Sequence, residues 1–147
     1  FMENLMDIWF DYNIPKDSIV IEVSEDKVKG GLSDVLDKIV ELKNNGFHIA
    51  IDNYGAKYAD LFLFSEVKFD TLKLDRELVH KLETDEKTCM ISKSVIDICK
   101  NYNISVVAEG VENEKEYDIL KEMGCDEAQG YLFDKPMSWN RFEEKYL

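Results

Sequence analysis

Short apolar runs alternate with segments of helical periodicity along most of the chain. Apolar residues at helical spacing predict helices over residues 1–12, 32–45, 58–67, 85–101 and 113–124, and a last helix after Ser138. Short apolar runs predict strands over residues 18–23, 47–51, 71–74 and 104–108, and a weaker strand over residues 128–133. Strands that alternate with helices are typical of βαβ units. The pattern therefore predicts an α/β fold with about five parallel strands.

Local signals predict several helix ends and the cover of the sheet. The strands are nearly continuous apolar runs, which predicts that both of their faces are covered. Asn113 and Glu116 have the spacing of a capping box, and Gly124 is a helix stop. Three aromatic residues are predicted to pack helices against the rest of the fold: Trp9, Trp139 and Phe142.

Composition narrows the possible classes of function. The chain has 147 residues, which suits one domain or part of a larger one. Its 18 basic and 31 acidic residues give a net charge of −13, so we expect neither a nucleic acid polymer nor a membrane surface as a direct partner. The three cysteines form no CxxC pair, which indicates free thiols. Of the two histidines, His48 is predicted to be a core residue and His80 to lie on a helix surface.

The absence of a long apolar run bears on location. No run in the sequence approaches the roughly 18 residues of a membrane span. We therefore expect a cytoplasmic location, either for a separate protein or for part of a larger, membrane-tethered signalling protein.

Charged or amide side chains lie within or directly after each predicted strand. Glu22 is in the first strand, Asp52 follows the second and Lys73 is within the third. Glu109 follows the fourth strand, and Gln129 lies in the fifth. Ligands of parallel α/β folds bind beyond the carboxyl ends of the strands, so we expect these side chains to meet at one rim.

Carboxylates that converge on one rim repel one another, and burial penalises their ionised forms. Either some of them are protonated or a divalent cation lies among them, since Mg²⁺, Mn²⁺ and Ca²⁺ prefer oxygen ligands. Lys73 lies between two leucines and needs a partner if it is buried. Each carboxylate taken alone can equally cap a helix or pair with a surface lysine, so this alternative stays open.

Five motifs resemble those of EAL domains and occur in that family's order. They are residues 21–25 (IEVSE), 52–55 (DNYG), 70–75 (DTLKLD), 106–112 (VVAEGVE) and 124–133 (GCDEAQGYLF). The resemblance covers roughly residues 17–142. It implies a TIM-type (β/α) barrel that hydrolyses cyclic di-GMP to linear pGpG with two metal ions, Mg²⁺ or Mn²⁺, in the complete domain.

The resemblance also implies roles for individual residues. Metal ligands would come from successive strands: Glu22, Asp52, Asn53 and Glu109. Three residues would be catalytic: Lys73, Glu109 and Glu112. Gln129 and Tyr131 would bind the substrate, and Glu25 would anchor the loop after the second strand. Two metals would lower the pKa of a bridging water and neutralise the charge of the phosphodiester.

The loop after the second strand departs from the family pattern. Asn53 stands where the family has a second aspartate, and an amide oxygen is a neutral ligand. Residues 56–60 (AKYAD) replace the usual TGYSS. The departures predict weakened or lost catalysis, and neutral drift on an exposed loop is the alternative explanation.

A second function class therefore stays open. The chain could be a catalytically silent receptor for cyclic di-GMP, or a dimerisation or interaction module. A homodimer would use the loop and helix after Asp52, where three residues are candidate contacts: Ala59, Leu61 and Phe62. A third reading, an unrelated barrel enzyme with a lysine base and carboxylate-held Mg²⁺, does not explain the order of the motifs.

The length is the last departure. A TIM barrel usually needs about 250 residues. The resemblance places a Glu-Ala-Leu strand and an Asn-bearing strand before residue 1, and both would supply metal ligands. We therefore expect residues 1–147 to be the C-terminal portion of a single EAL domain, an incomplete barrel with reduced or no activity by itself.

Overall fold

The sheet has five parallel strands that lie side by side in the order of the sequence. The computed structural model describes residues 2–12, 14–15, 18–25, 33–56, 61 and 63–147. The strands are β1 (Val20–Ser24), β2 (His48–Tyr54), β3 (Thr71–Leu74), β4 (Ser105–Glu109) and β5 (Glu127–Gln129). Each pairs in parallel with the next, so β1 and β5 are the edges and the sheet is not closed. The parallel α/β fold predicted from the sequence is confirmed.

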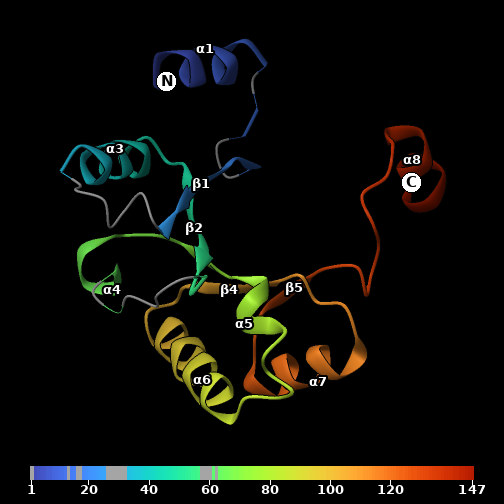
Figure 1. The fold of residues 1–147 in the computed structure, drawn as a ribbon. Coiled ribbons are helices and arrows are strands. Elements are labelled where there is room, and N and C mark those ends of the chain that lie inside the picture. Colours follow the sequence, from blue (N-terminus) through green and yellow to red (C-terminus); the bar gives the residue numbers. More distant parts are fainter. Residues whose placement is uncertain (1, 13, 16–17, 26–32, 57–60, 62) are drawn as a thin grey trace.

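Helices alternate with these strands. They are α1 (Met2–Tyr12), α3 (Ser33–Asn44), α4 (Leu63–Glu66), α5 (Arg76–Val79), α6 (Glu86–Asn101), α7 (Glu114–Met123) and α8 (Trp139–Tyr146). Figure 1 shows α3 near β1 and β2, α6 and α7 on the same side of the sheet, and α8 apart at the end of an extended segment. None of the helices in the described ranges combines the length and the apolar composition of a membrane span.

The ends of α7 follow the signals in the sequence. Asn113 Oδ1 accepts hydrogen bonds from the N–H groups of Lys115 and Glu116, both at 3.0 Å. Gly124 ends the helix in the left-handed region, with φ of 77°. A residue with a Cβ is strained there, which explains why glycine is the stop.

The two faces of the sheet differ, so the prediction of cover on both faces is wrong for the described residues. One face is apolar and packs against residues of α3, α6 and α7; its most buried strand residues are Ile49, Ile51, Leu72, Leu74 and Val106. The alternate positions are mostly polar and partly exposed, and they include Glu22, His48, Asp52, Lys73 and Glu109. His48 is thus exposed and not a core residue.

Other differences arise at turns. The fifth strand was expected over residues 128–133, but β5 stops at Gln129. The next residue, Gly130, passes so close to Val111 that a Cβ there would overlap the Val111 backbone. The sequence did not predict α5, which Asp75 caps by accepting the Glu77 N–H at 2.8 Å. Of the helix expected over residues 58–67, the structure shows α4, and residues 57–60 and 62 lie outside the described part.

Two motif aspartates tie strands together at the end of the sheet away from the predicted rim. Asp70 precedes β3, and its Oδ2 accepts the Ile49 N–H of β2 at 2.8 Å. Lys43 of α3 donates to both oxygens of Asp70, at 2.6 and 2.7 Å. Asp126 repeats the arrangement before β5, where its Oδ2 accepts the Val106 N–H at 2.8 Å. Asp70 and Asp126 therefore fix the register of neighbouring strands and do not belong to the candidate site.

Candidate active site at the carboxyl ends of the strands

Lys73 lies among three carboxylates from three other strands. Its Nζ is 2.6 Å from Glu22 Oε1, 2.8 Å from Glu109 Oε1 and 3.3 Å from Asp52 Oδ1. The Lys73 side chain is 12% exposed, whereas the carboxylate side chains are 23–51% exposed. The structure therefore brings together the four charged residues that the sequence places on successive strands.

Strand alternation explains this convergence. Leu72 and Leu74 point into the buried apolar face, so Lys73 must point to the opposite face. In the parallel register, Lys73 is opposite Val107, two residues before Glu109. Ser24 is opposite Asp52, two residues beyond Glu22. The side chains therefore share one face and one end of the sheet.

The electrostatics favour a permanently charged Lys73. Burial works against the ammonium ion, but hydrogen bonds to Glu109 and Glu22 outweigh it and raise the pKa of Lys73 above its ordinary value of 10.5. A lysine with a raised pKa stays protonated at neutral pH and cannot accept a proton. Lys73 therefore acts here as a fixed positive charge that offsets part of the carboxylate repulsion.

Asn53 adds a neutral group to the cluster. Its Nδ2 donates a hydrogen bond to Asp52 Oδ2 at 2.6 Å, and its backbone lies in the left-handed region with φ of 58°. Asparagine tolerates this conformation better than most residues. The amide therefore occupies the Asp52 oxygen that Lys73 leaves free.

The donor set suits a hard divalent cation. Glu22, Asp52 and Glu109 offer carboxylate oxygens, and Asn53 offers an amide oxygen, which are the ligands that Mg²⁺ and Mn²⁺ prefer. Within the described ranges, however, no group of three carboxylate, histidine or cysteine side chains is arranged to hold a metal ion. In the observed arrangement the three carboxylates converge on Lys73, so a bound cation would share them with its ammonium group.

The loop after Asp52 is tied to the first strand. Glu25 is buried, at 4% exposure, and its Oε2 accepts the Gly55 N–H at 3.1 Å. Gly55 has φ of 84°, and a Cβ there would overlap the Leu78 side chain. Glu25, for which the resemblance implies a loop-anchoring role, thus bonds the backbone of this loop at Gly55.

The polar partners of Lys73 among the described residues are Glu22, Asp52 and Glu109, and the remaining candidate residues are not among them. Gln129 is opposite Glu109 in the parallel register, which brings β5 to the same end of the sheet. Glu112 has an exposed side chain in the loop after β4. Tyr131 is 57% exposed, and Lys135 Nζ lies 5.3 Å from its ring centroid.

The candidate dimer contacts are only partly visible. Leu61 is 58% exposed, which makes its side chain available for a contact. Ala59 and Phe62 lie outside the described residues.

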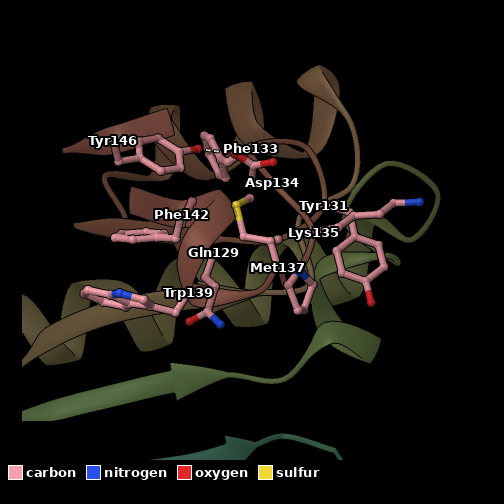
Figure 2. A pocket seen from close by; sticks show the side chains of 12 residues that line it. Gln129, Tyr131, Phe133, Asp134, Lys135, Met137, Trp139, Phe142 and Tyr146 are labelled. Carbon is pink, nitrogen blue, oxygen red and sulfur yellow. Dashed lines mark hydrogen bonds between the residues drawn. The ribbon is translucent and has the colours of Figure 1, made fainter. Parts of the chain in front are cut away.

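A cavity of about 770 Å³ lies between the end of β5 and α8. Figure 2 shows Trp139, Phe142 and Tyr146 one above another on α8, with Met137 beside them and Gln129 nearby. The rings of Trp139 and Phe142 stack with centroids 6.2 Å apart. Trp139 remains 64% exposed and Phe142 41% exposed, so the prediction that they pack a helix against the fold is wrong for the described residues.

Sequence reasoning missed one pair beside the site. His80 Nδ1 lies 3.0 Å from Oε1 of Glu116, which is buried in α7. The capping-box spacing pointed to Glu116, but nothing in the sequence pointed to His80 as its partner.

Comparisons with known proteins show which protein family the chain belongs to. The EAL domain family model matches residues 1–136. The cyclic di-GMP phosphodiesterase RocR of Pseudomonas aeruginosa is 34% identical over 140 residues, which are 95% of this chain and 36% of RocR. The chain belongs to the EAL domain family.

Solved structures agree with the family. The EAL domain of Mycobacterium smegmatis DcpA has a TM-score of 0.86 at 31% identity, over 97% of this chain and 64% of that one. A manganese and cyclic di-GMP complex of Klebsiella pneumoniae BlrP1 has a TM-score of 0.87 at 33% identity, over 92% of this chain and 34% of that one. The chain thus spans about a third of RocR and less than two thirds of the DcpA EAL domain.

Proposed function

We propose that residues 1–147 are the C-terminal portion of a single EAL domain, and that this domain hydrolyses cyclic di-GMP to pGpG with Mg²⁺ or Mn²⁺. The observation that carries the proposal is the convergence of Glu22, Asp52 and Glu109 on Lys73 at the carboxyl ends of the strands. RocR, a relative, is a cyclic di-GMP phosphodiesterase, and the similar BlrP1 structure is a manganese and cyclic di-GMP complex.

The proposed function assigns a separate role to each residue of the site. Glu22, Asp52 and Glu109 would hold the divalent cations, and the chemistry that such cations would supply is polarisation of the phosphodiester and a lower pKa of a bound water. Lys73 is the positive charge that holds an anionic phosphate oxygen at this end of the sheet, next to Glu22 and Glu109. Gln129 would bind the substrate at the same end of the sheet.

Glu112, Tyr131 and Glu25 complete the proposed set. Glu112 supports the reaction from the loop after β4, and Tyr131 binds substrate from the turn after β5. Glu25 holds the loop after Asp52 through the Gly55 N–H.

Asn53 makes the proposed activity weaker than that of a site with a second aspartate. Its side chain carries no charge, and its amide nitrogen faces Asp52. A neutral ligand attracts a divalent cation less than a carboxylate does. We therefore expect Asn53→Asp to raise the turnover number and to lower the Mn²⁺ concentration needed for half-maximal rate.

The test uses the complete domain, in which this segment is joined to the strands that the family places before it. The domain is incubated with cyclic di-GMP and Mn²⁺, and pGpG is measured by chromatography. Production of pGpG, lost in Glu109→Gln, supports the proposal. No turnover with Mg²⁺ or Mn²⁺, in both the natural sequence and Asn53→Asp, contradicts it.

A silent receptor or interaction module is the second candidate, and Asn53 is the observation that favours it. Calorimetry separates the two functions, since a receptor binds cyclic di-GMP without forming pGpG.

The exposed Leu61 also supports a proposed homodimer through the loop and helix after Asp52. Sedimentation of Leu61→Lys would show loss of that dimer. We propose a cytoplasmic location, without direct contact to nucleic acid polymers or membranes.

A further inference from the structure

A buried carboxylate lies outside the cluster around Lys73. Glu116 of α7 is 4% exposed, although a charged side chain is costly to bury without partners. Its capping-box position relative to Asn113 explains a contact at the start of α7, but it does not explain the bonds to His80 and Glu112. Its contacts therefore show what it does.

Both oxygens of Glu116 are bonded to other segments. Oε1 lies 3.0 Å from His80 Nδ1, and Oε2 accepts the backbone N–H of Glu112 at 2.8 Å. Burial raises the pKa of the carboxyl, but the His80 and Glu112 hydrogen bonds outweigh it and hold the pKa below its ordinary value. The carboxylate is therefore ionised at neutral pH and can serve as a double acceptor.

The two partners belong to the segments that follow site residues. His80 caps the C-terminus of α5, the short helix directly after the strand that carries Lys73. Glu112 lies in the loop directly after β4, three residues beyond Glu109. Glu116 thus joins the segment after Lys73 to the segment after Glu109.

The rest of this loop is fixed by backbone contacts. Gly110 has φ of 71°, and a Cβ there would lie 2.5 Å from the Arg76 Cβ of α5. The Val111 N–H donates to the Gln129 carbonyl at 3.0 Å, and the Val111 carbonyl accepts the Leu132 N–H at 3.0 Å. At Glu112, in contrast, the bond to the backbone N–H comes from the Glu116 side chain.

We propose that Glu116 is a positioning residue, whose carboxylate holds the Glu112 backbone against α5 through His80 and so fixes Glu112 relative to Lys73. The proposal rests on the proposed phosphodiesterase function for its catalytic consequence. We call the two bonds of Glu116, to His80 and to the Glu112 N–H, the clamp. The clamp can be measured without turnover.

The experiment compares three variants of the complete domain. Glu116→Ala removes both acceptor oxygens, whereas Glu116→Gln keeps an amide oxygen for the Glu112 N–H. Glu114→Gln is the matched control, because Glu114 is an exposed acid in the first turn of the same helix. Amide hydrogen exchange at Glu112 is measured by NMR, and kcat and KM for cyclic di-GMP are measured with Mn²⁺.

In Glu116→Ala we expect the Glu112 amide to exchange about tenfold faster. We also expect kcat to fall about tenfold or more with KM changed much less, because misplacement of a reacting group affects the transition state. Glu116→Gln should recover most of both properties, and Glu114→Gln should match the natural sequence. If Glu116 only stabilised the fold, Glu116→Ala and Glu116→Gln would have the same kcat and the same Glu112 exchange rate when compared at equal folded fraction.

Unchanged Glu112 exchange in a folded Glu116→Ala variant overturns the clamp, and faster exchange with unchanged kcat overturns the positioning role. If Glu116→Ala does not fold, His80→Ala replaces it and should raise Glu112 exchange and lower kcat by smaller factors; no change in either overturns the proposal. If the natural sequence has no turnover, the proposed function fails, while the exchange measurement still decides the clamp.

Discussion

Lys73 shows how one residue can make an otherwise unfavourable arrangement stable. Three carboxylates lie 2.6–3.3 Å from the ammonium nitrogen of Lys73. They would repel one another strongly if this positive charge did not lie between them. The ammonium ion is nearly buried, but three acidic partners compensate for its desolvation. The sequence predicted that Lys73 would need a partner, and the structure supplies three.

Replacement of Lys73 by methionine tests this account, because methionine keeps the length of the side chain and removes the charge. We expect the free energy of unfolding to fall by about 1–3 kcal/mol without metal, since the carboxylates lose their counter-charge and are themselves partly exposed. Addition of Mn²⁺ should raise the melting temperature of Lys73→Met more than that of the natural sequence. Equal shifts in the two proteins would argue against Lys73 as the counter-charge.

A second residue lacks the compensation that Lys73 has. Ser92 of α6 is 1% exposed, and among the described residues its Oγ has no hydrogen-bond partner. Ser92→Ala should therefore raise the free energy of unfolding by up to about 1 kcal/mol relative to Ser94→Ala. Ser94 is the matched control because it lies in the same helix, is exposed and donates to the Met90 carbonyl. Urea titration measures both, and a larger gain in Ser94→Ala would refute the argument.

Among the helices and strands, the sequence predicted most of their order along the chain. It did not predict that one face of the sheet is apolar and the other polar. Periodicity located strands such as residues 71–74 to the residue, because a buried leucine on each side of Lys73 leaves a clear alternation. The same alternation was interpreted as a continuous apolar run, which hid the polar face. The α5 helix was missed because its four residues are too few to show a helical period.

The amino ends of the strands give a pH-dependent prediction. Burial raises the pKa of Asp70, but Lys43 and the Ile49 N–H outweigh it and lower the pKa below its ordinary value of 3.8. The depressed pKa means that Asp70 contributes stability above about pH 3.8 and that this contribution is lost as the pH falls through the lower folded value. The free energy of unfolding should therefore decrease on acidification through this range.

Asp70→Asn should lower the free energy of unfolding by about 1–3 kcal/mol at pH 7 and should flatten its decrease as the pH falls below 3.8. Asp118→Asn, at an exposed position of α7, is the control and should keep the slope of the natural sequence. Urea unfolding at several pH values measures the slope. An unchanged slope in Asp70→Asn would show that the bonds to Lys43 and Ile49 do not depress the pKa.

In the part of the chain that the structure describes, the sheet has two unpaired edges and a partly exposed polar face. Motif order predicted the family and the convergence of four site residues, since parallel strands bring their carboxyl ends together whatever the loops do. It could not predict the pairing of His80 with Glu116, or the direction of the Asn53 amide. The first depends on packing between segments 36 residues apart in the sequence. The second depends on the left-handed backbone of Asn53, which turns the amide toward its neighbour Asp52 and leaves no trace in the apolar pattern.

We propose that the carboxylates around Lys73 hold divalent cations in the complete domain. Electron paramagnetic resonance of free Mn²⁺ measures this binding without any need for turnover. We predict that the complete domain binds Mn²⁺ and that Glu22→Gln combined with Asp52→Asn weakens binding at least about tenfold, because two charged oxygen ligands are lost. Equal Mn²⁺ affinity in the natural sequence and the double variant would contradict the account.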